Sequence, residues 1–262
     1  MVKTYVNPFL SVVIPAYNEE HFIAGCLHSL TNQTLSSREY ELIVVDNNSS
    51  DKTASISRLF GATVVRETRQ SVIIARQAGL LASRGTIILS ADADTQYPDN
   101  WLSHIHTQFK KNQDLVGIVG WLYFPSSPVV LQIVTDMLQY MNIAYERLTG
   151  KCLFAFGCNF AFRADTFRKL GGYSLNLPEL GDQLDIVKRL GKTGRIIIDK
   201  NSYCYSSNRR HGNMWKTVFL YNGWYRVIGY FINKISGRTI IGSAPPVRTI
   251  PAQKFRSTQR GV

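Results

Sequence analysis

The first 90 residues alternate short apolar runs with segments of helical spacing, and this alternation constrains the fold more than any other feature. Apolar runs typical of buried strands occupy residues 9–15, 40–45, 63–66 and 86–90. Helical spacing occupies the intervening segments 19–31, 53–60 and 71–83. Strands that alternate with helices predict an α/β fold with a mostly parallel, doubly wound central sheet.

The second half of the chain is less regular. Helical patterns cover residues 129–148 and 179–190, and a further strand is expected at 195–199. Residues 214–235 have the spacing of one more helix, which Gly223 and Gly229 weaken. A chain of 262 residues can bury a core without disulfide or metal support.

Charge is distributed unevenly along the chain, whose net charge is +12. No acidic residue follows Asp199, whereas residues 201–262 contain ten Lys or Arg, so the first 200 residues carry only 20 − 18 = +2. Such asymmetry favours an anionic partner: a membrane surface, a nucleic acid or a phosphorylated ligand. A solvated basic tail is the alternative.

Two further features bear on the cellular compartment. No run of 18 apolar residues is present and the N-terminus makes a poor signal peptide, so neither a membrane-spanning helix nor secretion is expected. The four cysteines have no metal-binding spacing and are interpreted as reduced thiols of a cytoplasmic protein.

Acidic and polar residues follow the predicted strands where ligands bind in such sheets, beyond the carboxyl ends. Asp92-Ala93-Asp94 comes directly after the strand at 86–90. Two carboxylates on either side of a small residue can both face a divalent cation, which also takes phosphate oxygens of a substrate. The triplet predicts a Mg²⁺ or Mn²⁺ site, although such triplets also occur in loops by chance.

Five stretches in order carry a resemblance to a known family. They are 12–20 (VVIPAYNEE), 44–53 (VVDNNSSDKT), 75–85 with its Arg76, Asp92-Ala93-Asp94, and Asn159–Arg163 followed by Gly171-Gly172-Tyr173. As a set, they resemble the nucleotide-sugar-dependent glycosyltransferases of family 2, which have the GT-A fold. The resemblance spans about residues 9–200 and implies transfer of a sugar in glycan, glycolipid or cell-envelope synthesis.

The resemblance implies a donor site for a nucleoside-diphosphate sugar. Asp46 would accept a hydrogen bond from the base, and Arg76 would stand near the base or the diphosphate. Asp92 would lie near the ribose and the metal, with Ala93 beside it, and Asp94 would bind the metal. The residues that would line the nucleoside pocket are Pro15, Ala16, Tyr17 and Glu19. A helix cap for Asp46 and a solvated helix charge for Arg76 are the structural alternatives.

The catalytic base is where the chain departs from the family pattern. Inverting members usually have Glu-Asp-x-Asp here, whereas this chain has Asp182-Gln183-Leu184-Asp185. Aligned on Asp185 and the later Arg189, Gln183 occupies the usual position of the base, and glutamine cannot accept a proton. Two hypotheses remain open. In the first, the acceptor is a hydroxyl whose proton is accepted by Asp182, with Asp185 on the same helix face. In the second, the acceptor is an anionic polyprenyl phosphate, which needs no base.

Further assignments fall on the acceptor side and in the C-terminal part. The resemblance places Asn159 on the acceptor side, with a turn residue as the alternative. Arg209 and Arg210 are assigned there too and can neutralise diphosphate, while His211 would complete the metal shell. A surface-loop histidine is the alternative for His211.

The domain prediction follows from these assignments. We expect a GT-A domain over 1–205, with a donor half at about 9–100 and an acceptor half at 101–205. An amphipathic helical segment over 206–240 and a basic flexible tail over 241–262 follow. Trp and Tyr beside basic residues suit a helix on anionic lipid at the inner face of the cell membrane, and a helix packed on the sheet is the alternative.

Two functions of other classes were weighed. A nucleic-acid partner is not expected, because the chain has no nucleic-acid-binding motif and the basic tail alone would not explain Asp92-Ala93-Asp94. A binding module that keeps the donor pocket without catalysis remains open, and Gln183 is its best support.

Overall fold

The computed structural model describes residues 7–125, 127–175, 177 and 181–207. The chain separates into two units, residues 1–206 and 207–262, and all described helices and strands lie in the first. The helix expected at 214–235, the amphipathic segment from residue 208 onward and the basic tail at 241–262 lie outside the described residues.

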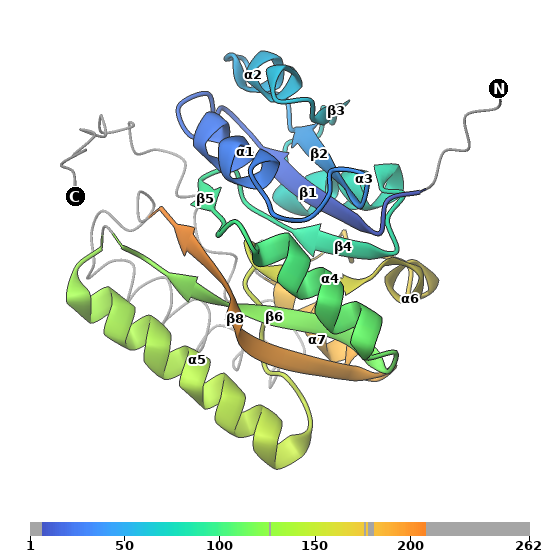
Figure 1. Ribbon diagram of the computed structural model, residues 1–262, viewed down its shortest axis with the longest axis vertical. Coiled ribbons are helices and arrows are strands. Elements are labelled where there is room, and N and C mark those ends of the chain that lie inside the picture. The colour runs from blue at the N-terminus through green and yellow to red at the C-terminus, as the bar shows by residue number, and fades with distance from the viewer. Residues whose placement is uncertain (1–6, 126, 176, 178–180, 208–262) are drawn as a thin grey trace. The chain divides into compact units, whose positions relative to one another are not determined.

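The described part contains eight strands and seven helices (Figure 1). The strands are β1 (Leu10–Ala16), β2 (Tyr40–Asp46), β3 (Thr63–Arg66), β4 (Ile87–Ser90), β5 (Thr95–Gln96), β6 (Leu115–Tyr123), β7 (Phe160–Arg163) and β8 (Arg195–Ser206). The helices are α1 (Ile23–Thr31), α2 (Thr53–Leu59), α3 (Val72–Ala82), α4 (Trp101–Lys111), α5 (Val129–Thr149), α6 (Ala164–Lys169) and α7 (Gly181–Leu190).

All eight strands form one sheet in the order β3-β2-β1-β4-β7-β6-β8-β5. The first four strands are parallel, because α1, α2 and α3 carry the chain back between them. β7 is antiparallel to both of its neighbours, β4 and β6, and β5 is antiparallel to β8. The predicted α/β fold is confirmed, with a parallel first half and a mixed second half.

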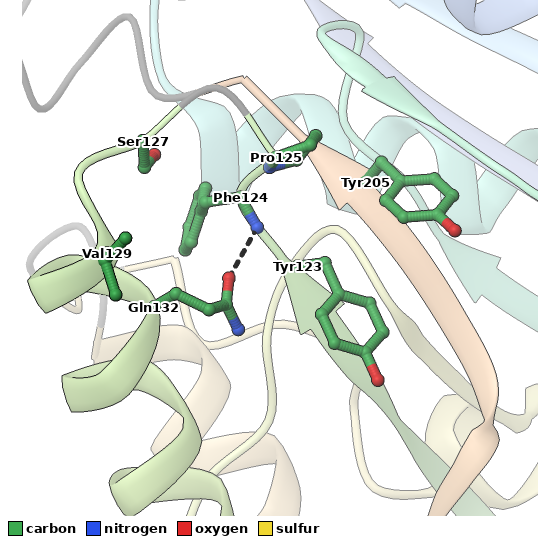
Figure 2. Close-up of a pocket in the computed structure, with 7 residues that line it drawn as sticks. All are labelled: Tyr123, Phe124, Pro125, Ser127, Val129, Gln132 and Tyr205. Carbon is green, nitrogen blue, oxygen red and sulfur yellow. Dashed lines mark hydrogen bonds between the residues drawn. The ribbon is translucent and has the colours of Figure 1, made fainter.

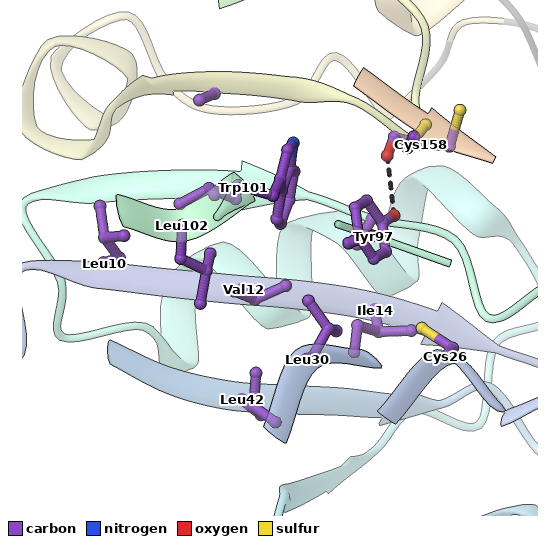
Figure 3. Close-up of a cluster of buried hydrophobic side chains, with 14 of the residues drawn as sticks. Leu10, Val12, Ile14, Cys26, Leu30, Leu42, Tyr97, Trp101, Leu102 and Cys158 are labelled. Carbon is purple, nitrogen blue, oxygen red and sulfur yellow. Dashed lines mark hydrogen bonds between the residues drawn. The ribbon is translucent and has the colours of Figure 1, made fainter. Parts of the chain in front are cut away.

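Each face of the sheet carries its own hydrophobic core. One core packs α1 and α4 against the sheet around Ile14, Leu27 and Trp101 (Figure 3). The other packs α3, α6 and α7 against the opposite face around Phe162 and Phe167. In Figure 1, α1 and α4 lie in front of the sheet and α7 lies behind it.

The structure adds elements to which the sequence analysis assigned no secondary structure. They are α4, β5, β6, β7 and α6. β6 is buried along nearly its whole length, so its apolar run shows no alternation that would mark it as a strand. The first helix begins at Ile23 rather than Glu19, because the backbone N–H groups of Glu19 and Glu20 donate to side chains of the next loop.

Among the described residues, no helix combines the length and the apolar character needed to cross a bilayer. The four cysteines are free thiols.

Candidate active site

The carboxyl ends of β1, β2 and β4 meet at one edge of the sheet. Ala16 and Asp46, the last residues of β1 and β2, are direct neighbours in the parallel register. β4 lies on the other side of β1, where the backbone N–H of Ala91 donates to Val13. The three loops that the sequence analysis singled out therefore start side by side.

The loops after β1 and β2 are tied together by polar contacts. Asn18, at φ 53°, donates its N–H to Ser49 Oγ at 3.0 Å and accepts from Ser50 N at 2.9 Å. The N–H of Glu19 donates to Thr53 Oγ1 at 2.7 Å, and that of Glu20 donates to Asp51 Oδ2 at 3.0 Å. These contacts fix the two loops as one rim.

The residues predicted to hold the nucleoside lie on this rim. Asp46 is buried, and its Oδ1 accepts from the N–H of Ser49 at 3.1 Å. Ala16 and Glu19 are buried, whereas Pro15 and Tyr17 are half-buried. The structure therefore gathers these residues in one place.

Asn47 is a rim residue that the sequence analysis did not assign. Its side chain is buried, donates to the carbonyls of Glu67 and Arg69, and accepts from the N–H of Ser71. It thereby fixes the loop that leads into α3. The turn-like sequence around it gives no signal for this role.

The backbone of Asp92 is held on both sides. Its N–H donates to Tyr97 Oη at 3.3 Å, and its carbonyl accepts from Cys26 Sγ at 3.5 Å. Tyr97 in turn donates to the carbonyl of Cys158 at 2.8 Å, as Figure 3 shows. Ala93 is buried, while Asp92 and Asp94 are half-buried.

Arg76 connects the loop after β4 to α7. Its Nη2 donates to Asp92 Oδ1 at 3.1 Å, and its Nη1 donates to Asp182 Oδ2 at 2.8 Å. The side chain of Arg76 is only 8% exposed and that of Asp182 only 1%. Arg76 is therefore a buried cation between two carboxylates that lie far from each other in the sequence.

Two opposing effects act on the protonation of Arg76. Burial alone would lower its pKa, but the carboxylates of Asp182 and Asp92 outweigh burial and raise the pKa above its usual value. Arg76 therefore stays charged at every pH at which the protein is folded. The solvated helix charge considered as an alternative for Arg76 is wrong.

The surroundings of Arg76 are tightly packed. A Cβ atom on Gly157 would come within 2.3 Å of Arg76 Nη2, so a larger residue there would displace the guanidinium. Arg76 Nε and Gln183 Oε1 are buried and have no hydrogen-bond partner among the residues that the structure describes. A bound molecule or water can satisfy such atoms.

The carboxylates of α7 are committed to contacts within the protein. Asp182 Oδ2 accepts from Gln183 Nε2 at 2.9 Å as well as from Arg76. Asp185 Oδ2 accepts from Ser174 Oγ and from Arg189, which also donates to the carbonyls of Leu170 and Gly172. The Asp185–Arg189 pair thus holds the turn before α7.

Asn159 is buried, 1% exposed, where β6, β7, α4 and β8 approach one another. Its Nδ2 donates to the carbonyls of Trp121 and Ser202, and its Oδ1 accepts from Trp101 Nε1 at 3.1 Å. These contacts give Asn159 a structural role. Its place on the acceptor side stays a prediction.

The carboxylates of Asp92 and Asp94 supply oxygen ligands, which suit a hard divalent cation that also binds substrate phosphate. Among the residues that the structure describes, no group of three or more His, Cys, Asp or Glu could hold a metal. Burial, followed by the charges of Asp94 and Asp92, raises the pKa of the nearby Cys26 thiol well above its usual value. Asp92 and Asp94 would therefore hold the cation together with a diphosphate.

Three predicted residues lie outside the described part of the chain. They are Arg209, Arg210 and His211. Their roles stay predictions.

Comparison with known proteins decides the family. The sequence profile described as Glycosyl transferase family 2 matches residues 11–171, more than half of the chain. The chain belongs to glycosyltransferase family 2. The resemblance drawn from the five stretches is thereby confirmed.

Two curated relatives of this family 2 member have names that describe a transferase. Glycosyltransferase AglE of Haloferax volcanii is 30% identical over 186 residues, which are 68% of this chain and 60% of AglE. An undecaprenyl-phosphate 4-deoxy-4-formamido-L-arabinose transferase of Pseudomonas aeruginosa is 28% identical over 60% of this chain and 47% of the relative. The chain thus spans about half to three-fifths of these relatives.

Solved structures of glycosyltransferases share the fold. The mannosyltransferase PcManGT of Pyrobaculum calidifontis, in complex with GDP-Man and Mn²⁺, superposes with a TM-score of 0.71 at 20% identity, over 92% of this chain and 67% of that one. S. aureus TarS 1-349 with UDP-GlcNAc gives 0.61 at 19% identity, over 76% and 58%. These likenesses confirm the GT-A fold.

We expect Arg76→Met to lower the free energy of unfolding by about 3–5 kcal/mol, because it leaves the buried carboxylate of Asp182 without its cation. The double variant Arg76→Met/Asp182→Leu should recover part of that loss. Arg69→Met, which removes the exposed ion pair to Glu67, is the matched control and should leave the free energy of unfolding nearly unchanged. Urea unfolding measures all three, and equal losses at positions 76 and 69 would contradict the buried bridge.

Proposed function

We propose that the protein transfers a sugar, with inversion, from a nucleoside-diphosphate sugar to a polyprenyl phosphate, and that transfer depends on Mg²⁺ or Mn²⁺. One observation supports the reaction most directly. Asp46, Asp92, Asp94 and Arg76 meet at the carboxyl edge of the sheet, where α/β folds bind their ligands. The described surroundings suit a nucleotide on the rim and a diphosphate beside Asp92 and Asp94.

The donor end of the site matches a nucleoside diphosphate in chemistry. Asp46 supplies an acceptor for the N–H groups of a base, next to the half-buried ring of Tyr17. The neighbouring structure of PcManGT contains GDP-Man and Mn²⁺, and that of TarS contains UDP-GlcNAc. By analogy, we assign the same donor class to this chain.

The acceptor is inferred from the carboxylates of α7. Gln183 cannot accept a proton, Asp182 is paired with Arg76, and Asp185 is paired with Arg189. A hydroxyl acceptor benefits from a positioned base, whereas a phosphate monoester is already anionic near neutral pH. A relative described as an undecaprenyl-phosphate transferase agrees with this acceptor.

The proposed reaction needs no proton transfer. A phosphate oxygen of the acceptor attacks the anomeric carbon from the side opposite the leaving group. The bond from that carbon to the donor diphosphate breaks, and its electron pair stays on the diphosphate. A bound divalent cation would neutralise the charge that develops there. Arg76 acts as a positioning residue that holds Asp92 in place.

The basic C-terminal part suggests where the enzyme works. Residues 201–262 contain ten Lys or Arg and no acid, and each basic residue near an anionic membrane contributes about 1 kcal/mol of attraction. We therefore place the enzyme on the cytoplasmic face of a membrane that contains its acceptor.

The metal assignment is tested with Asp94→Ala. This variant should lose the Mn²⁺-dependent part of nucleoside-diphosphate affinity and at least about 100-fold in turnover, because its remaining carboxylate holds the cation poorly. Asp165→Ala, an exposed acid on α6, is the control and should change neither quantity. Calorimetric titration with and without Mn²⁺ measures affinity. Unchanged metal dependence in Asp94→Ala would refute the site.

The acceptor is tested with a matched pair of lipids, polyprenyl phosphate and the corresponding polyprenol. Labelled sugar should enter the organic phase with the phosphate and not with the alcohol. Gln183→Asp should not speed transfer to the phosphate, because no proton has to be removed. Product on polyprenol alone would overturn the phosphate acceptor and favour a hydroxyl. Donor binding without any transfer would favour the non-catalytic module.

A further inference from the structure

Helix α5 turns a mostly polar face toward the protein and an apolar face outward, which is the reverse of the other long helices. Its buried positions are Leu131, Thr135, Gln139 and Asn142, three of them polar. No side chain of α5 belongs to either hydrophobic core. Figure 1 shows α5 on the outer side of β6 and β8, away from the other helices.

Polar side chains attach α5 to the rest of the domain. Gln139 donates to and accepts from the backbone of Leu122, and Gln132 accepts from the N–H of Phe124 at 2.8 Å. Asn142 bonds the backbone of Leu153 and Phe154 in the same way. The sheet-facing side of α5 is thus held by amide groups rather than by apolar packing.

The outward side of α5 is apolar along the whole helix. Its exposed large apolar side chains are Val129, Val130, Ile133, Met137, Leu138, Tyr140, Met141 and Leu148. At 100° per residue they fall within one half of the helix circumference, with Arg147 at the border. All eight are at least 36% exposed, and they form a patch larger than scattered surface residues would give.

The patch continues into a pocket near the candidate active site. A cavity of about 350 Å³ lies between the ends of β6 and β8 and the start of α5, lined by Tyr123, Phe124, Pro125, Ser127, Val129, Gln132 and Tyr205. Figure 2 shows Tyr123 and Tyr205 on neighbouring strands beside it. Tyr205 pairs with Gln96 of β5, two residues after Asp94. The apolar surface therefore leads toward the metal motif.

We propose that the outward side of α5 lies at the headgroup–acyl boundary of an anionic membrane, and that the adjoining pocket receives the apolar chain of a membrane-borne acceptor. The second part of this inference rests on the proposed polyprenyl phosphate acceptor, whereas the membrane contact does not. The membrane contact made by α5 would belong to the glycosyltransferase domain itself and would not depend on the basic residues at 201–262.

Two observations favour a lipid surface over a second copy of the chain. A protein interface has about one hydrogen bond per 100–200 Å², whereas the hydroxyl of Tyr140 is the only side-chain hydrogen-bonding group among the eight exposed residues. Basic groups lie near the patch: Lys200 stands 3.9 Å from the Tyr140 ring centroid, and Arg147 and Lys151 lie at the end of α5. Cations beside an apolar helix face match an anionic bilayer.

The test substitutes two residues of the patch in the full chain, Ile133 and Met137, which are 59% and 55% exposed. The variant Ile133→Glu/Met137→Glu should bind phosphatidylcholine–phosphatidylglycerol vesicles at least about tenfold more weakly in co-sedimentation. The control is Leu59→Glu/Leu81→Glu on α2 and α3, where the leucines are 86% and 71% exposed, and it should bind within twofold of wild type. The difference should persist in about 1 M NaCl, which screens the basic residues.

Two measurements, nucleotide binding and transfer to a water-soluble acceptor, distinguish failure of this inference from failure of the proposed function. The α5 variant should keep Mn²⁺-dependent nucleotide affinity and transfer to a short water-soluble isoprenyl phosphate, yet lose transfer to polyprenyl phosphate in vesicles. Vesicle binding equal to wild type would overturn the inference. So would a wild-type dimer in analytical ultracentrifugation that the variant abolishes, or a large loss of thermal stability in the variant, since the face would then pack against protein.

Discussion

The buried guanidinium of Arg76 is the interaction on which the candidate site depends. Arg76 comes from α3, Asp92 follows β4, and Asp182 begins α7, so one cation joins three elements that are 16 and 106 residues apart. Arg76 as a whole residue is only 7% exposed, and a charge buried to this extent is stable only when opposite charges pair with it. The pair with Asp182 therefore fixes where α7 meets α3 and the loop after β4.

The rest of the site follows from that constraint. Because Arg76 holds Asp92 from one side and Tyr97 and Cys26 hold its backbone from the other, the metal motif has little freedom. The same bridge occupies Asp182, which sequence reasoning offered as a base. The positioning of Asp92 and the pairing of Asp182 are thus two consequences of one buried cation, while Asp185 is paired separately with Arg189. Both pairings on α7 agree with an anionic acceptor.

Much of the donor half could be predicted from the sequence. β3 begins and ends at the predicted residues, β2 and β4 differ from prediction by one residue at one end, and β1 is shifted by one residue at both ends. The agreement is close because parallel buried strands are bounded by polar loops. The grouping of Asp46 and Asp92 followed from the rule for strand ends. Arg76 was assigned to the site through the resemblance alone, and its pairing with Asp182 depends on tertiary contacts.

The second half was harder to predict for physical reasons. Asn159 donates to the backbone carbonyls of Trp121 and Ser202, far away in the sequence, and no local pattern marks such contacts. The helix at 129–148 was predicted, but periodicity gives an apolar face without saying whether protein or another phase covers it. Here the apolar face points away from both cores, the reverse of the usual arrangement.

The central claim, that the carboxyl edge of the sheet binds a nucleoside diphosphate through a cation at Asp92 and Asp94, can be tested most directly by crystallography. Crystals grown with Mn²⁺ and a nucleoside diphosphate would be measured for anomalous scattering. We expect a manganese peak between the carboxylate of Asp94 and the diphosphate, with the base near Asp46 and Arg76 still paired with Asp182. A nucleotide bound elsewhere, or a diphosphate on this edge without a metal peak, would contradict the account.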